Sequence, residues 1–165
     1  MSASTSFSSP VTQHLNRLGI PYQVVFHSNS AISLEQAAAE RGQSIDQIIR
    51  SLLFRAARQE FVMVLIAGKR QVSWKALRRY LGTSRLTMAT DEEVLSWTGY
   101  PVGAVSPFGV ENPFRLLVDQ SALLPAEVSI GSGQRGIAIL LSQSNFRKAL
   151  NTYESGEFSS LEVKP

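Results

Sequence analysis

The chain has 165 residues, of which 44% are hydrophobic and 18% are charged, as expected for one globular domain that can bury a proper core. Because Cys is absent, disulfides, Cys-ligated zinc and cysteine nucleophiles are excluded, and the two His residues disfavour an all-histidine metal site. The net charge of +3 indicates only a mild attraction to polyanions. No apolar run approaches the roughly 18 residues of a membrane span, and the composition is compatible with a cytoplasmic protein.

The N-terminus predicts a flexible leader followed by a helix. Residues 1–9 are rich in Ser and Thr, but they lack the basic and apolar regions of a secretory signal. Ser9 and Pro10 provide a helix cap and a first-position proline, and Gly19 ends the helix. The apolar face of this helix is predicted to consist of Val11, Leu15 and Leu18.

Further helices are predicted from their N-terminal signals. At three places a Ser or Thr is followed three residues later by Glu or Gln, which is the capping-box pattern. At two others a single Ser provides the cap. These signals predict helices over residues 33–42, 44–47, 73–82, 90–97 and 142–150, and a turn or short helix is expected at residues 119–124.

The remaining periodic segments have the composition of strands, at residues 22–26, 49–55, 61–67, 114–118, 127–130 and 137–141. The polar turn at residues 57–60 predicts a hairpin, whose return strand is apolar throughout and therefore central, with both faces covered. A direct hairpin argues against strict βαβ alternation and favours a mixed α/β (α+β) fold. We expect one domain over residues 10–151 and a polar, frayed tail over residues 152–165.

The stretch from Thr98 to Gly109, TGYPVGAVSPFG, contains three glycines and two prolines. Small residues at its centre would let the backbone approach a ligand, and uncovered amides can hold a developing oxyanion. The alternative is a strand flanked by turns. The pattern alone favours this alternative, because short Gly-rich motifs often occur by chance.

This loop resembles the Gly-Tyr-x-x-Gly-Gly-x-Ser-Pro loop of the YbaK/ProX family, the free-standing relatives of the editing domain inserted in bacterial prolyl-tRNA synthetases. Residues 49–53 resemble the family's Lys-Thr-Leu-Leu strand, and residues 131–136 resemble its Ser-Gly-Gly-Lys-Arg-Gly loop. The resemblance covers residues 10–150. It implies a partly barrel-like mixed sheet of about six or seven strands with peripheral helices. Nothing in the sequence calls for a metal or an organic cofactor.

By this resemblance, Arg50 occupies the position of the family's active-site lysine. On a strand it shares a face with Leu52 and Phe54, opposite Ser51 and Leu53, and the alternative is a strand-end arginine that reaches water. Arg stays charged at working pH, so a mechanism that needs a neutral amine is unavailable, whereas one that needs a fixed cation is kept. Arg50 would then orient the substrate carbonyl or the surroundings of the α-amino group, or contact a phosphate of the terminal adenosine.

The resemblance also implies that amides of the first glycine loop bind the ester carbonyl. Ala104 replaces the second glycine of the family's pair. The expected catalytic residues are Arg50, Gly103, Ala104 and Ser106. The expected substrate-binding residues are His27, Val105, Pro107, Gly131, Ser132 and Gly133.

Alternatives remain at several of these positions. Ser132 is displaced by one position from the family's serine, so it either replaces that hydroxyl or is a turn serine. Arg135 either lines the site or forms a structural ion pair, and His27 is either a pocket residue or a loop histidine in solvent. His14, beside the apolar face of the first helix, is expected to be structural.

A basic face is predicted on the helix at residues 73–82, formed by Lys75, Arg78 and Arg79. Such a face is usually solvated, and the resemblance implies that it contacts tRNA phosphates. The implied activity is trans-editing, the hydrolysis of mischarged aminoacyl-tRNA. The expected partners are aminoacyl-tRNA and, as a second candidate, an aminoacyl-tRNA synthetase, but no membrane. The alternatives are an aminoacyl-tRNA or nucleotide-binding module that has lost turnover with the Lys-to-Arg change, and a general nucleic-acid binder.

Overall fold

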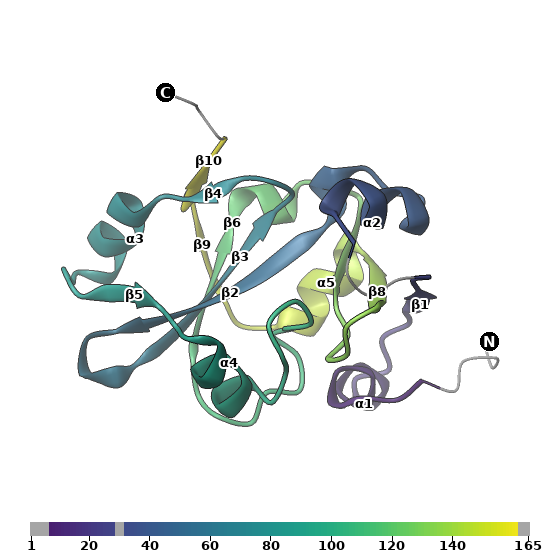
Figure 1. Ribbon diagram of the computed structural model, residues 1–165, viewed down its shortest axis with the longest axis horizontal. Helices are drawn as coiled ribbons and strands as arrows, with labels where there is room; N and C mark the ends of the chain where they lie inside the picture. Colours follow the sequence, from purple (N-terminus) through teal and green to yellow (C-terminus); the bar gives the residue numbers. More distant parts are fainter. Residues whose placement is uncertain (1–6, 29–31, 162–165) are drawn as a thin grey trace.

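The computed structural model describes residues 7–28 and 32–161 (Figure 1). Its helices are α1 (Pro10–Arg17), α2 (Leu34–Arg41), α3 (Trp74–Leu81), α4 (Asp91–Thr98) and α5 (Gln143–Leu150), with short 3-10 turns at Ile45–Gln47, Ala57–Gln59 and Gln120–Leu123. None of the helices in this part of the chain has the length and apolar character needed to cross a membrane. Most of the leader predicted over residues 1–9 lies outside the described residues.

The strands are β1 (Gln23–Phe26), β2 (Ile49–Ala56), β3 (Phe61–Ala67), β4 (Gln71–Val72), β5 (Leu86–Met88), β6 (Arg115–Asp119), β7 (Glu127–Gly131), β8 (Ile137–Ser142), β9 (Glu154–Gly156) and β10 (Ser159–Ser160). All six predicted strands are present. The four others, β4, β5, β9 and β10, are too short to produce a periodic sequence signal.

The strands form two main sheets and one small pair. A five-stranded sheet has the order β5-β2-β3-β6-β9, a three-stranded sheet has the order β1-β8-β7, and β10 pairs with β4. The predicted β2–β3 hairpin is antiparallel, whereas β3–β6 and β6–β9 are parallel. A single parallel bridge between Ile48 and Ser129 joins the two main sheets at one corner. The mixed α/β fold is therefore confirmed, with a wall that is partly barrel-like and not closed.

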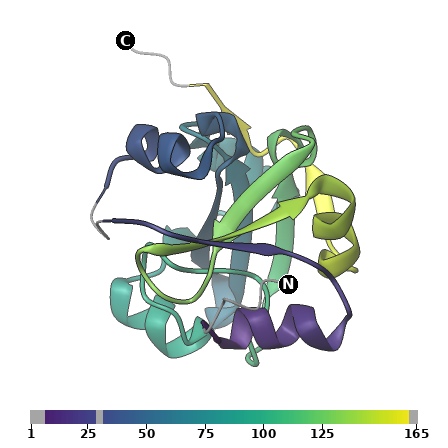
Figure 2. The ribbon, with the colours of Figure 1, turned by 90° about the vertical axis from the view of Figure 1, so that its right-hand side faces the viewer.

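The central strand β3 is buried on both faces, as its apolar sequence predicts. On one face Met63 and Leu65 join a core cluster that includes Val11 of α1 and Phe146 of α5. On the other face Val62, Val64 and Ile66 join a second cluster with Leu77 of α3 and Phe158 of the tail. Figure 2 shows α1 (purple) below the strands and α5 (yellow-green) beside them.

Local capping signals place the helix ends as predicted. The Ser9 side chain accepts hydrogen bonds from the amides of Val11 and Thr12, and Gly42 ends α2 in the left-handed conformation. One expectation is wrong: Leu18 is the C-cap of α1 and is 50% exposed, so it does not continue the apolar face. The helix ends before the turn on which Leu18 would point inward.

Residues 152–161 of the predicted C-terminal tail are not frayed, and residues 162–165 lie outside the described residues. β9 pairs in parallel with β6, β10 pairs with β4, and Phe158 between them is buried. Buried Asp119 anchors this connection, because its Oδ1 accepts from the Phe158 amide at 2.6 Å and its Oδ2 accepts from Ser159 Oγ at 2.7 Å. The anchoring side chain lies 39 residues before the amide it binds, so the polar tail sequence carries no sign of it.

We predict that Phe158→Ala lowers the free energy of unfolding by about 3–5 kcal/mol, because it leaves a cavity between α3 and the five-stranded sheet. Urea denaturation of the full chain measures this change. Leu161→Ala, at a tail residue that is 66% exposed, is the matched control and should change stability by less than about 0.5 kcal/mol. Equal small effects at both positions would show that the tail does not pack.

Candidate functional site

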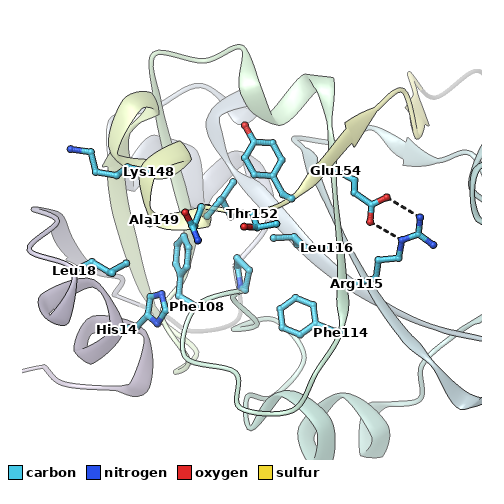
Figure 3. A pocket seen from close by; sticks show the side chains of 14 residues that line it. His14, Leu18, Phe108, Phe114, Arg115, Leu116, Lys148, Ala149, Thr152 and Glu154 are labelled. Atoms are coloured by element: carbon cyan, nitrogen blue, oxygen red, sulfur yellow. Dashed lines mark hydrogen bonds and ion pairs between the residues drawn. The ribbon is translucent and has the colours of Figure 1, made fainter.

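Two cavities lie on either side of the loop between α4 and β6. The first, which we call the arginine cavity, has a volume of about 760 Å³ and is bounded by α2, β2, the start of α4 and the loops at residues 102–105 and 130–137. The second, which we call the tail cavity, has a volume of about 740 Å³ and lies between α1, α5, β6 and the chain that leads into β9 (Figure 3). The predicted site residues that line the arginine cavity are His27, Arg50, Gly103, Val105 and Gly131.

One wall of the arginine cavity is an edge of β2 that, over residues 49–53, pairs with no other strand in the described part of the chain. β5 pairs only with residues 54–56 of β2, so residues 49–53 lie along the cavity instead of beside another full strand. The Ala89 amide donates to the Leu53 carbonyl at 3.0 Å, which shows that the backbone groups of Leu53 point to this edge. Because backbone groups alternate along a strand, the amide and carbonyl of Ser51 point to the same edge. Ser51 Oγ is buried and has no hydrogen-bond partner within the described ranges.

The two glycine loops form the opposite wall and touch each other closely. A Cβ on Gly131 would lie 2.7 Å from the Ala104 carbonyl oxygen, so only glycine fits there. The Gly133 amide donates to the same carbonyl at 2.9 Å. The Ala104 amide donates to the Pro101 carbonyl at 3.0 Å, so it is already occupied.

Several predicted site residues therefore lie behind the cavity wall. Ala104, Ser106 and Ser132 are completely or almost completely buried and do not line the arginine cavity. Ser106 Oγ accepts from the Phe108 amide, and Ser132 Oγ bonds both the amide and the carbonyl of Gln134. These contacts stabilise the loops themselves. Gly133 also lies outside the cavity lining, and Pro107 lines the tail cavity.

Tyr100 holds the first loop from within. Its hydroxyl donates to the Phe108 carbonyl at 2.6 Å, and its ring lies against Gly133 of the second loop. Burial raises the pKa of Tyr100 to about 12, so the hydroxyl remains a donor at every pH at which the protein would work. Tyr100 thus fixes the spacing of the two loops.

Arg50 lines the arginine cavity, but its guanidinium is engaged elsewhere. Nε donates to the Gly68 carbonyl at 2.7 Å, and Nη2 donates to the Arg70 carbonyl. Both carbonyls belong to the turn between β3 and β4. Burial lowers the pKa of Arg50 from its ordinary value. In this arrangement Arg50 ties that turn to β2.

Sequence reasoning missed a second arginine in the cavity wall. Arg41, the last residue of α2, donates from Nε to His27 Nε2 at 3.0 Å and from Nη1 to Ser129 Oγ at 2.7 Å. The His27 ring is only 2% exposed and pairs through Nδ1 with Glu40 at 2.7 Å. His27 is therefore a pocket residue rather than a loop histidine in solvent. A basic residue in the last turn of a helix commonly complements the helix dipole, so the position of Arg41 in the sequence gives no sign of a role in the cavity.

Among the described residues, the charged ones in the cavity lining are three arginines and one aspartate. Arg135, at the exposed rim, donates from Nε to the Val102 carbonyl at 2.9 Å, and Asp91 begins α4. Most of the other lining residues are apolar, among them Leu34, Leu53, Val94, Val105, Ile130 and Ile137. Within residues 7–28 and 32–161 there is no group of three His, Asp or Glu side chains that could hold a metal. This cavity can thus hold an uncharged group against apolar walls and an anionic group against arginine.

The tail cavity has a different character (Figure 3). His14 stacks on Phe108 with ring centroids 5.6 Å apart, and burial, with a smaller effect of Arg17, lowers the pKa of His14. At the other end Arg115 and Glu154 form two parallel hydrogen bonds of 2.7 and 2.8 Å, which lower the pKa of Glu154 to about 2. Arg115 and Glu154 are thus paired with each other, whereas within the described residues no ion pair involves the three arginines or the aspartate that line the arginine cavity.

The basic residues predicted on α3 lie on its outer side. Lys75 and Arg79 are exposed and Arg78 is half-buried. None of the three takes part in an ion pair within the described part of the chain, and they line neither cavity.

Comparisons with known proteins agree on one family. The model of a family described as an aminoacyl-tRNA editing domain matches residues 28–149. The proline–tRNA ligase of Thermosipho melanesiensis is 36% identical over 86 residues, which are 52% of this chain but only 15% of the ligase. The uncharacterised protein YwhH of Bacillus subtilis is 30% identical over 132 residues, or 80% of this chain and 83% of that protein. The crystal structure of a candidate trans-editing enzyme for prolyl-tRNA synthetase has a TM-score of 0.83 at 25% identity, covering 94% of this chain and 99% of that one.

We predict that Gly131→Ala destabilises the protein by about 3 kcal/mol, because the new Cβ meets backbone atoms that cannot yield without moving the first glycine loop. Thermal and urea unfolding measure this effect. Gly42→Ala is the matched control: it has open space around it but a φ of +69°, so it should cost only about 1 kcal/mol. A smaller loss at Gly131 than at Gly42 would contradict the close contact of the two loops.

Proposed function

Since this chain belongs to the aminoacyl-tRNA editing domain family, we propose that it is a trans-editing deacylase that hydrolyses the ester bond of mischarged aminoacyl-tRNA. The observation that carries the proposal is the arginine cavity, where an unpaired strand edge faces two glycine loops across a largely apolar space with arginines in its wall. Binding of an aminoacyl group together with the terminal adenosine of its tRNA needs such a combination of apolar surface, backbone donors and positive charge. Its substrate would be met in the cytoplasm.

Hydrolysis adds a water oxygen to the ester carbon and breaks the bond to the ribose oxygen, which leaves with a proton. The carbonyl oxygen becomes an oxyanion in between, and fixed donors lower the energy of that state. Because the Ala104 amide is already bonded to Pro101, we assign this role to the amides of Gly103 and Val105, which line the cavity. Ser51 lines the same cavity, and its buried Oγ, which lacks a partner within the described ranges, would have to rotate to hydrogen-bond the attacking water or the substrate's amino group.

The walls set the limits of amino-acid selection. An apolar pocket discriminates one methylene by only about 1–3 kcal/mol. Selection between amino acids must therefore depend mainly on the shape of the space between β2 and the glycine loops. An aminoacyl-tRNA synthetase, as a partner, would add selectivity by presenting particular tRNAs to this protein.

A specific observation favours a second candidate function, a non-catalytic binding module. The residue at the family's lysine position, Arg50, donates to two backbone carbonyls of the β3–β4 turn. A chain that had lost turnover with that lysine would keep the cavity and still bind an aminoacylated tRNA end.

To test the deacylase, a panel of aminoacyl-tRNAs that includes alanyl-, cysteinyl- and seryl-tRNA(Pro) is incubated with the wild type and with Val102→Trp. Val102 is 42% exposed at the cavity mouth, so Trp should block entry without disturbing the core and lower kcat/KM by about tenfold or more. Leu124→Trp, at an 80% exposed residue that lines neither cavity, is the matched control. Binding of the aminoacylated end without turnover of any species would favour the binding module.

We also propose that the outer side of α3 contacts tRNA phosphates. The double variant Lys75→Gln/Arg79→Gln should weaken tRNA binding and reduce the slope of log Kd against log salt by about one per cation removed. Arg17→Gln, which removes an exposed cation from α1, is the control and should leave the slope unchanged. An unchanged slope in the double variant would remove α3 from the interface.

A further inference from the structure

Arg41 is held in the cavity wall by acceptors that carry no negative charge. Its Nε–H points to His27 Nε2 and its Nη1 to Ser129 Oγ, and within the described residues no carboxylate lies within ion-pair distance of it. The nearby carboxylate, Glu40, accepts instead from His27 Nδ1, Ser28 and Gln36. A half-buried cation without a counter-ion is costly, which suggests a charge supplied by a ligand.

The same contacts fix the orientation of the guanidinium. Because Glu40 accepts the hydrogen bond from Nδ1–H of His27, Nε2 of the ring is left as an acceptor for Arg41. Two of the five guanidinium donors are thus used to hold the fork, and Nη2 has no hydrogen-bond partner within the described ranges. Burial lowers the pKa of Arg41 to about 10, which still leaves it charged at neutral pH.

The two other arginines of the cavity are less suited to this task. Arg50 is bound through Nε and Nη2 to the carbonyls of Gly68 and Arg70. Arg135 stands at the exposed rim, where solvent weakens its attraction for an anion.

We infer that Arg41, held by His27 and Ser129, is the cation that binds an anionic oxygen group of the substrate in the arginine cavity. This inference rests on the proposed function and gives the site's cation a place on α2 instead of β2. The anionic group belongs either to the phosphate that precedes the terminal adenosine or to a carboxylate in the aminoacyl side chain. Both present oxygens that can accept from Nη2 in a charge-assisted hydrogen bond. His27 is then a positioning residue that acts through Arg41.

The test compares wild type, Arg41→Met, Arg41→Lys and Arg50→Met. For each we measure kcat and KM of deacylation, Kd for a minihelix that carries a non-hydrolysable 3′-aminoacylamide, and the temperature of unfolding. We expect Arg41→Met to raise KM and Kd about tenfold or more with little change in kcat, because binding energy is lost before the chemical step. Arg41→Lys, which keeps a cation, should recover part of this loss, whereas a merely structural role would lower the unfolding temperature and leave KM and Kd unchanged.

Two substrate arms separate the sources of the anion. If Arg41 binds the phosphate, its effect disappears with aminoacyl-adenosine, which lacks that phosphate. If Arg41 binds a side-chain carboxylate, the effect persists with aspartyl- or glutamyl-adenosine and is absent with the alanyl form. Either result supports the inference.

Other outcomes overturn it. KM and Kd of Arg41→Met within threefold of the wild type, or an equal rise in Arg50→Met, would remove the role from Arg41. A wild type that turns over no substrate but binds the minihelix through Arg41 would contradict the deacylase proposal and support the assignment of Arg41 as the anion-binding cation. A wild type that neither hydrolyses nor binds would overturn both.

Discussion

The close contact between the two glycine loops is the constraint on which the candidate site depends. Gly131 lies against the backbone of Ala104, and the Gly133 amide bonds the Ala104 carbonyl. Through this contact the end of the three-stranded sheet packs against the loop that follows α4. The bridge from Ile48 to Ser129 joins the two main sheets at another corner. The space left between these two attachments is the arginine cavity. Any residue larger than glycine at position 131 would move a wall of that cavity.

Local signals in the sequence predict most of the fold. The N-caps at Ser9, Ser33 and Thr90 and the apolar run of β3 act within a few residues, so pattern analysis finds them. The short strands β9 and β10 depend on the side chain of Asp119, which is remote in sequence and has no periodic pattern to reveal it. Features that depend on neighbouring residues could thus be predicted, whereas features that depend on residues far apart in the sequence could not.

The candidate site shows the same division. Arg50, Gly103, Val105, Gly131 and His27 were placed by motif and alternation, and all of them line the cavity. The partners of Arg50 come from a turn 18 and 20 residues later, and the bond from Arg41 to Ser129 spans 88 residues, so neither could be read from a local pattern. The hydroxyls of Ser132 and Ser106 have the right chemistry for a site, but both form hydrogen bonds inside their own loops. Motif matches thus located the cavity better than they assigned its side chains.

The unpaired edge of β2 has a consequence for the behaviour of the whole chain in concentrated solution. A bare strand edge is a template for pairing with another molecule, and proteins commonly cover such edges. Here α2, the start of α4 and both glycine loops line the same cavity as residues 49–53, so the elements that shape the cavity also stand beside this edge. Shortening either loop to admit a larger ligand would therefore expose an adhesive surface. Redesign of the pocket and resistance to aggregation are coupled through the same five residues.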